Sequence, residues 1–524
     1  MDARDTVLDD GILYIDRGLV DHVLPAGAPP PPGYEQIAPV ETAGTAYPGL
    51  IELHNHLPYD ILRLWPVPRR FENRSQWGGS SNPDYRRLVT GPMEILGEDP
   101  ETMPAIVRYA EVKALVNGTT TSQGIALFSN AGSRRMYRGI VRNVEATDDS
   151  ALPEAKTRIA DVEAEDAGRF LARLQQPHRL LLHLAEGTNQ RARDHFLALQ
   201  FEPGHWAITD NLVGIHCTPL TAEDFRVMKN HGGSMVWSPL SNLLLYGQTT
   251  DVAAAAAAGI LIGLGSDWSV SGSKGLLGEL KAARLASAAQ GTVFSDLELV
   301  SMVTRNAARI LRWEHALGSL SPSRYADVIV VRGTVGDPYT QLVEARDQDI
   351  SLVVINGVAR YGSTGLMRPL TPDGGLLEPV SAGVPADRTV QLRQLSADNV
   401  VGSLTLAAAV ERLDEALADL PGTASRAVEA NLVRRLEGAP SWRIALDETA
   451  PTDSELRPRL PLLHTRTRRP SGPEVGRGDL TAPLQNSIVL DPLTAGADKG
   501  FLDSLQTQLN LPALFGAQLR DLLT

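Results

Sequence analysis

The 524-residue chain has little cysteine, no long apolar run and no excess of positive charge. Its single cysteine, Cys217, excludes an intrachain disulfide and fits a reducing compartment. The polar and acidic residues 1–5 do not resemble a secretory signal, and no apolar run reaches membrane-spanning length. The net charge of −13 argues against general nucleic-acid binding. We therefore expect a cytoplasmic protein without a nucleic-acid or membrane partner.

The middle of the chain alternates short β-branched runs with amphipathic segments. Such alternation predicts a parallel sheet with crossover helices, and over residues 47–317 its natural closure is a (β/α)8 barrel of the α/β class. Only seven strands can be identified, so the eighth is expected as a short strand between residues 124 and 138, or the barrel is distorted. The predicted strands are 49–54, 119–123, 139–145, 179–184, 211–216, 233–237 and 260–266.

The two sides of this insert carry further β-like segments. Residues 12–20 are expected to pair with residues 325–331 and 350–357, which predicts a β-sandwich built from residues 1–46 and 318–365. Residues 366–524 form a C-terminal extension that is partly helical. Within it the apolar spacing predicts a helix from Leu406 to Leu420 and another through Phe501, Leu502, Leu505 and Leu509, and the composition predicts a loop over residues 457–483.

Four predicted strands end in residues that can bind a metal or move a proton. The segment PGLIELHNH, residues 48–56, ends in two histidines whose side chains share one face of a strand. Later strands end in His183, with Glu186 three residues on, in His216 and in Asp267. Taken alone, each of these residues could have only a structural role: a histidine could be hydrogen-bonded in the core, and Asp267 could lie in a turn. Together, at the strand ends where barrel enzymes hold their chemistry, they indicate a metal-assisted hydrolase.

Neutral imidazoles with one carboxylate suit a single divalent ion, Zn²⁺ or Fe²⁺, and leave a coordination position for water. Such an ion lowers the pKa of the water toward about 7, so that hydroxide is available at neutral pH. No other cofactor is expected.

Several motifs resemble the amidohydrolase superfamily, in the branch of cytosine and guanine deaminases and triazine hydrolases. The resemblance covers about residues 6–362 and implies a metal-dependent barrel with a composite sandwich. Its motifs are PGLIELHNH (48–56), NGTTT (117–121), HLAE (183–186), SPLSNL (238–243), GLGSD (263–267), TRNAARIL (304–311) and GSLSPSRYADVIV (318–330).

The resemblance also implies a role for each site residue. Glu186 would be the proton shuttle, His216 would hold the hydroxide and the oxyanion, and Asp267 would also accept the proton of the attacking water. The implied metal ligands are His54, His56, His183 and Asp267.

Three features bear on the number of metals and on the substrate. Binuclear relatives usually carry a carboxylated lysine, but Lys156 lies in an acidic segment expected to be helix or loop, which favours one metal ion. Glu145 is either a further ligand or a salt-bridge or loop partner. The loop 57–92, rich in arginine and aromatic residues, either stacks on a flat substrate or is a solvated loop anchored by aromatic packing. Ser241 and Asn242 fit the family signature or cap a turn.

The sequence thus predicts a hydrolase of a non-peptide carbon–nitrogen bond that acts on a small molecule. The expected reaction is deamination of a heterocyclic or amidine substrate by a metal-bound hydroxide, because Glu186 can protonate a ring nitrogen before ammonia leaves. Hydrolysis of an amide, lactam or imide at the same site is the alternative enzyme reading. A non-catalytic scaffold of the same fold is the alternative of another class, and homo-oligomerisation stays open.

Overall fold

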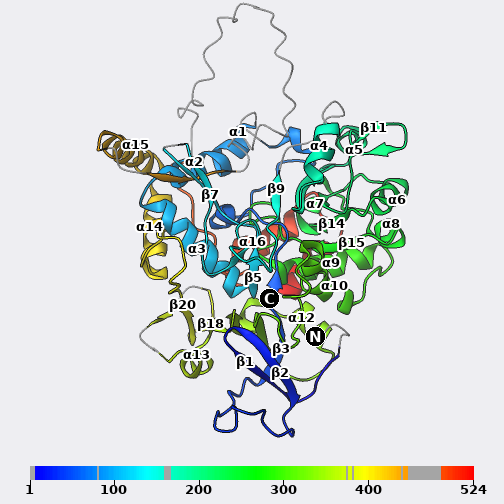
Figure 1. The fold of residues 1–524 in the computed structure, drawn as a ribbon. Coiled ribbons are helices and arrows are strands. Elements are labelled where there is room, and N and C mark those ends of the chain that lie inside the picture. The colour runs from blue at the N-terminus through cyan, green and yellow to red at the C-terminus, as the bar shows by residue number, and fades with distance from the viewer. Residues whose placement is uncertain are drawn as a thin grey trace, which may run out of the picture.

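The computed structural model describes residues 6–78, 82–130, 132–158, 167–372, 376–380, 383–437, 441–446 and 485–524. Within these ranges the chain builds a ring of parallel strands, a six-stranded sheet, and C-terminal helices that pack on them. In Figure 1 the helices of residues 406–436 lie along the left side of the molecule and the N-terminal hairpin lies at the bottom. No helix in the described ranges is both long enough and apolar enough to cross a bilayer.

Eight parallel strands form the ring, in two hydrogen-bonded arcs ordered β4-β5-β8 and β9-β10-β13-β14-β15. A bridge between Asn55 and Asp267 joins β4 to β15, and the Ala155 amide donates to the Val144 carbonyl between β8 and β9. The strands are β4 (Leu50–Ile51), β5 (Thr119–Ser122), β8 (Arg142–Asn143), β9 (Lys156–Arg158), β10 (Leu180–Leu184), β13 (Leu212–His216), β14 (Ser234–Trp237) and β15 (Leu261–Leu264).

The eighth strand is not where the sequence predicted it. Residues 124–138 do contain β6 (Ala126–Ser129) and β7 (Arg134–Met136), but these pair antiparallel with each other. They join β21 (Trp442–Ile444) of the C-terminal extension in a separate small sheet. The missing barrel strand is β9, which lies parallel to β10. Lys156 therefore lies in a strand, and the expectation of helix or loop for its segment was wrong.

Helices follow the barrel strands, and α5, α6, α8 and α10 begin at polar side-chain caps. The Thr221 and Asp224 side chains form a capping box at α6, and Ser295 and Glu298 do the same at α10. The crossover helices are α3 (Thr102–Val116), α4 (Ala167–Leu174), α5 (Gln190–Leu197), α6 (Ala222–Asn230), α7 (Pro239–Tyr246), α8 (Val252–Ala257), α9 (Leu276–Ala289), α10 (Asp296–Met302) and α11 (Arg305–Leu311). A small hairpin, β11 (Gln200–Glu202) and β12 (His205–Trp206), follows α5.

The long loop after β4 folds into short helices. They are η1 (Leu57–Ile61), η2 (Arg74–Gln76), α1 (Pro83–Tyr85), the π-turn η3 (Arg86–Thr90) and α2 (Gly91–Glu98). This loop is compact because its aromatic side chains are buried, among them Tyr59, Trp65 and Trp77.

The six-stranded sheet has the order β19-β20-β18-β17-β16-β3 and joins residues from both sides of the barrel. In β16 the side chains of Val328 and Val330 pack in one apolar cluster, while Ile329 and Val331 pack in the main core on the opposite face. Its strands are β3 (Gly44–Pro48), β16 (Val328–Arg332), β17 (Ile350–Ile355), β18 (Val358–Ser363), β19 (Leu377–Pro379) and β20 (Arg388–Gln391), with α12 (Pro338–Glu344), η5 (Asp347–Asp349) and α13 (Thr364–Leu370) between them.

The partner of β16 from the N-terminal side is β3, and residues 12–20 are not in this sheet. They form the hairpin β1 (Gly11–Asp16) and β2 (Leu19–Pro25), which is held to the segment before β16 by hydrogen bonds between Val20 and residues 323–324. Because β19 and β20 come after residue 365, the sheet continues into the segment that the sequence analysis assigned to the extension. The four domain boundaries stay predictions.

The C-terminal extension is partly helical in the described ranges. Helix α14 (Leu406–Ala418) packs on α3, α15 (Leu420–Leu436) packs on α2, and α17 (Phe515–Leu523) packs on α9 and on α16 (Lys499–Thr507). The predicted second helix is too long at its end, because α16 stops at Thr507 and Leu509 is exposed. The predicted loop 457–483 lies outside the described residues.

Candidate metal centre

The predicted site residues meet at the carboxyl ends of the barrel strands. His54 and His56 follow β4, His183 lies in β10, His216 ends β13 and Asp267 follows β15. Together with Glu186, none of these side chains is more than 6% exposed. The strand-end pattern in the sequence therefore corresponds to one buried cluster in space.

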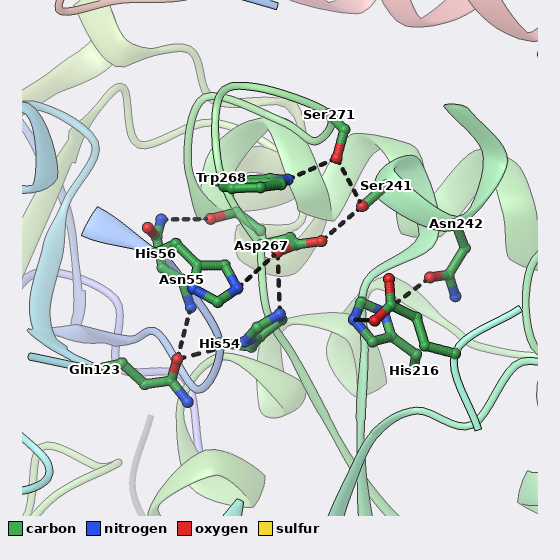
Figure 2. Close-up of polar contacts among 12 residues, drawn as sticks. His54, Asn55, His56, Gln123, His216, Ser241, Asn242, Asp267, Trp268 and Ser271 are labelled. Carbon is green, nitrogen blue, oxygen red and sulfur yellow. Dashed lines mark hydrogen bonds and ion pairs between the residues drawn. The ribbon is translucent and has the colours of Figure 1, made fainter. Parts of the chain in front are cut away.

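Two overlapping groups in this cluster have the spacing of a metal site. His54, His56 and Asp267 form one group and His54, His183 and His216 form the other, each with its ligand atoms within 4.8 Å of one another. Figure 2 shows the imidazoles of His54 and His56 converging on the Asp267 carboxylate, with Nε2–Oδ1 distances of 3.1 and 3.5 Å. The rings of His183 and His54 are 4.6 Å apart between centroids.

Hydrogen bonds fix which nitrogen of two imidazoles faces the cluster. Nδ1 of His54 lies 3.3 Å from Gln123 Oε1, and Nδ1 of His216 lies 2.9 Å from Asn242 Oδ1. A carbonyl oxygen only accepts, so each Nδ1 carries the hydrogen and each Nε2 has a lone pair in the neutral ring. Both Nε2 atoms are buried: that of His54 lies 3.1 Å from Asp267 Oδ1, and that of His216 has no hydrogen-bond partner among the described residues. Buried lone pairs that face one point fit a divalent cation.

Burial also sets the protonation states. It lowers the pKa of His54 to about 4 and lowers the pKa of His183 well below its usual value, so both rings are neutral at pH 7. For Asp267 burial alone would raise the pKa, but the neighbouring His54 outweighs it and the net pKa is lowered. Neutral imidazoles beside a carboxylate are the donor set that Zn²⁺ accepts.

The strand-end backbone is bent to aim these side chains inward. Ala185, His216 and Asp267 all adopt positive φ, at 54°, 70° and 66°, a region that costs a non-glycine residue about 1 kcal/mol or more. A Cβ on Gly265 would lie 2.9 Å from the backbone nitrogen and oxygen of His54, so the glycine of the GLGSD motif lets β15 approach β4. Backbone strain thus concentrates where the cluster forms.

Glu186 faces the cluster and is held from its outer side. The Tyr246 hydroxyl donates to Glu186 Oε1 at 2.7 Å and accepts from Trp77 Nε1 at 2.8 Å. The other oxygen, Oε2, lies 3.9 Å from His216 Nε2 and 3.5 Å from Arg74 Nε, and it has no hydrogen-bond partner among the described residues. One carboxylate oxygen is therefore anchored while the other faces the centre.

The loop after β4 closes over this centre. Residue 73 forms a bridge with residue 187, and the Arg74 amide donates to the Glu186 carbonyl. Of the arginines that the sequence analysis singled out in this loop, Arg74 lies beside Glu186. The aromatic residues pack on one another and on Trp268, whose ring centroid lies 5.1 Å from that of His56. Aromatic packing anchors the loop, as one of the two alternatives predicted, but much of the loop is buried and not solvated.

Asn242 and Ser241 do more than cap a turn. Asn242 contacts His216, and the Ser241 hydroxyl donates to Asp267 Oδ2 at 2.6 Å (Figure 2). Glu145 instead accepts hydrogen bonds from the Gly124 amide and the Thr157 hydroxyl, and it belongs to neither ligand group in the described chain. The side chain of Lys156 pairs with Glu154 at the start of β9, the end opposite the site.

Sequence reasoning missed Gln123, Tyr246 and Glu52. Glu52 is buried beneath the site and accepts hydrogen bonds from the Ser266 amide and hydroxyl and from the His54 amide, and burial raises its pKa to about 8. Only Glu52 carried a signal, since an acidic residue within an apolar strand is unusual.

Comparison with known proteins shows which families and proteins this chain resembles. Residues 180–360 match the profile of the Amidohydrolase family. The 5-methylthioadenosine/S-adenosylhomocysteine deaminase of Moorella thermoacetica is 24% identical over 400 residues, which cover 67% of this chain and 90% of that protein. The S-triazine hydrolase of Gordonia rubripertincta is 24% identical over 161 residues, which are 29% of this chain and 34% of that protein.

The fold agrees with that of a solved relative. The atrazine chlorohydrolase of Arthrobacter aurescens, crystallised with zinc, superposes with a TM-score of 0.50 at 19% identity, covering 68% of this chain and 92% of that one. The barrel and its buried histidine–aspartate cluster define the class of barrel hydrolases with a metal-type site. Within that class, residues 180–360 of the chain match the Amidohydrolase family.

Proposed function

We propose that the chain is a metal-dependent aminohydrolase that removes an amino group from a heterocyclic or amidine small molecule. The observation that carries this proposal is the placement of Glu186, which has one anchored oxygen and one oxygen that faces the ligand cluster. Deamination of a ring requires a proton on the ring nitrogen before ammonia leaves, and a carboxyl group in this position can deliver it.

The metal site is assigned to His54, His56, His183 and Asp267, which would hold one divalent ion, with Zn²⁺ favoured over Fe²⁺. A bound ion of this kind supplies Lewis-acid chemistry and lowers the pKa of water. His216 has ligand spacing to His54 and His183, but its contact with Asn242 also suits a residue that holds the attacking oxygen. We assign it the second role.

The proton transfers are assigned to two carboxylates. Asp267 takes the proton of the attacking water on Oδ1, while Ser241 holds Oδ2 and so keeps the carboxylate oriented. Glu186 carries a proton on Oε2 to the ring nitrogen, and Tyr246 prevents the side chain from turning away. Trp268 and the loop after β4 exclude bulk water from these transfers.

The relatives give the substrate classes to examine first. Their names include 5-methylthioadenosine, S-adenosylhomocysteine and triazine substrates, so a purine nucleoside or an aminated triazine is the first choice. A cytoplasmic location fits the single cysteine. Hydrolysis of an amide, lactam or imide is the second candidate function, because a strong acid/base pair beside a metal site also serves that reaction.

The test is ammonia release by the Zn²⁺-loaded protein from adenine nucleosides, guanine, cytosine and aminotriazines, with Glu186→Gln as the control. We expect release from at least one ring type, and release slower by a factor of about 10² or more in the control. Ring opening of lactams or imides without any ammonia release would favour the second candidate. Inactivity of a metal-loaded protein on both groups would contradict the proposal.

A further inference from the structure

The C-terminal segment, residues 485–524, brings a buried acid to the rim of the barrel that carries the site. Asp491 is 0% exposed, and its backbone amide donates to the Ile61 carbonyl at 2.9 Å. Ile61 ends η1, the turn that starts directly after His56. A residue more than four hundred positions away in sequence therefore contacts the loop that follows two candidate ligands.

Two buried lysines meet the carboxylate of Asp491. Lys274 donates to Oδ1 and Lys113 donates to Oδ2, and both side chains are at most 2% exposed. Lys113 also donates to the Asp60 carbonyl at 2.6 Å, and Lys274 also pairs with Asp498 at 2.8 Å. Two acids of the C-terminal segment thus balance two lysines of the barrel.

These contacts connect directly to the loops that hold the site. Asp60 lies four residues after His56, and its Oδ1 accepts from the Ser269 amide at 2.8 Å. Ser269 lies two residues after Asp267, and its hydroxyl donates to the Leu62 carbonyl at 2.7 Å. The loops after β4 and β15 are therefore bound to each other, and Asp491 is bound to both through its lysines.

A second contact reaches the helix that supports the site. The Asn510 side-chain amide donates to the Leu244 carbonyl at 2.7 Å and to the Arg69 carbonyl at 3.2 Å. Leu244 lies in α7, which carries Ser241, Asn242 and Tyr246. The C-terminal segment thus touches three elements whose side chains form the candidate centre.

Stability alone is a weak reason for such a cluster. The cost of removing two acids and two lysines from water offsets much of their attraction, and apolar side chains would often serve folding as well. Ion pairs with defined hydrogen bonds do fix the relative position of the groups they join. Fixing position matters here because His56 and Asp267 must stay within ligand distance of one metal ion.

We propose that Asp491 is a positioning residue of the active site, which sets the His56 and Asp267 loops through Lys113 and Lys274. The inference rests on the proposed function for its metal site. It gives the C-terminal segment a role in metal retention and turnover.

The test compares Zn²⁺-loaded wild type with Asp491→Asn and Asp491→Glu. We expect Asp491→Asn to lose zinc to a chelator about tenfold faster or more, as when a group that orients a ligand is removed. Hydrogen exchange should speed up at residues 57–62 and 267–275. Asp491→Glu keeps the charge and should fall between wild type and Asp491→Asn.

The matched control is Leu519→Ala, which removes buried packing of α17 in the same segment without touching Asp491. Each protein is measured at the same interval below its own Tm. Equal zinc loss and equal loop exchange in Asp491→Asn and Leu519→Ala would overturn the proposal. If Asp491→Asn does not fold, Asp498→Asn replaces it: faster zinc loss supports the proposal, and a wild-type rate overturns it.

These readouts do not depend on the substrate. Failure to release ammonia from any ring would overturn the proposed function while the zinc-loss comparison still decides the role of Asp491. Where a substrate is found, Asp491→Asn should lower kcat more than it raises KM, because loop position affects the reacting groups.

Discussion

At the scale of single residues, four of the six candidate ligands and proton carriers have a second side chain that holds them from outside. Gln123 orients His54, Asn242 orients His216, Ser241 orients Asp267 and Tyr246 orients Glu186. Partners of this kind fix the tautomer and the direction of a ligand, and their loss weakens metal binding or activity.

Replacing Glu186 and Asp267 by their amides, one at a time, should separate metal binding from proton transfer. Glu186→Gln should lower kcat by a factor of about 10² to 10⁴ with zinc retained, because only the proton carrier is lost. Asp267→Asn should lose activity and much of its zinc. Activity assays with zinc analysis on the same preparations check both, and wild-type turnover in Glu186→Gln would remove Glu186 from its assigned role.

His216→Ala tests whether His216 is a ligand. The assigned role predicts that zinc stays bound while turnover falls by about 10² or more, because the attacking water loses the group that orients it. Zinc stoichiometry per chain measures this. Loss of zinc equal to that of His54→Ala would make His216 a ligand and leave another residue to hold the attacking oxygen.

Tyr246→Phe removes one hydroxyl from the site. Burial raises the pKa of Tyr246 well above its usual value, so the hydroxyl stays protonated and donates to Glu186 at all ordinary pH values. We expect kcat to fall about tenfold with zinc content unchanged, because Glu186 loses its anchor. Steady-state kinetics would show it, and an unchanged kcat would mean that Arg74 alone orients the acid.

The strand-end ligands were predictable because their residue types and positions are local properties of the sequence. The side chains that orient these ligands could not be predicted in this way. Gln123 and Tyr246 lie in unremarkable local sequence, and they become functional only because β5 and α7 pack beside the ligands. The same is true of Asp491, whose partners are distant in the chain.

At the scale of elements, helix α9 carries two buried ionisable groups that respond to pH in opposite directions. Burial raises the pKa of Glu279 to about 8 and lowers the pKa of Lys281 to about 7. Glu279 accepts from the Leu240 amide and Ser273, so it links α9 to the start of α7. Ionisation of these groups therefore affects the stability of α9 and of its contact with α7, the helix that carries Ser241 and Asn242.

Glu279→Gln should reduce the change of the free energy of unfolding with pH. Between pH 4.5 and about 8 the folded state keeps the Glu279 proton that the unfolded state releases, so the free energy of unfolding falls as pH rises. The slope from one such group is at most about 1.4 kcal/mol per pH unit. Denaturant unfolding of metal-free wild type and variant at pH 5 and pH 7 should show a smaller decrease in the variant.

The interval below pH 7 is chosen because of Lys281. Above pH 7 its lowered pKa makes the folded state more stable as pH rises, since only the unfolded chain then binds that proton. Ionisation of Glu52 changes the free energy of unfolding in the same direction as that of Glu279. Because Glu52 is present in both proteins, its contribution cancels in the comparison. Equal slopes in wild type and variant would show that Glu279 is ionised in the folded state.

Seven barrel strands could be predicted from their apolar or β-branched runs, and the structure contains each of them. β9 was missed because Lys156, Thr157 and Arg158 carry no apolar run, and a strand this short is defined by its pairing with β10. For a related reason, the predicted pairing of residues 12–20 with residues 325–331 holds only at Leu19, which forms an isolated bridge with Tyr325. A β-like pattern indicates a strand but does not identify its partner, which here is the adjacent strand of a hairpin.

At the scale of the whole molecule, the site is closed. Its six polar residues are buried beneath the loop after β4, and the C-terminal segment packs across the same rim. Substrate therefore needs the loop to open, as in enzymes in which loop motion limits turnover. Because the C-terminal segment is tied to this loop, it is part of the enzyme and not an independent module.

The central claim is that the four strand-end residues bind a metal ion. The direct measurement is elemental analysis of protein purified without added metal, beside the double variant His54→Ala/His56→Ala. We predict about one Zn or Fe per wild-type chain, as expected for a site of four protein ligands, and loss of it in the folded variant. A folded wild-type protein that binds no metal, even after incubation with Zn²⁺, would contradict the account.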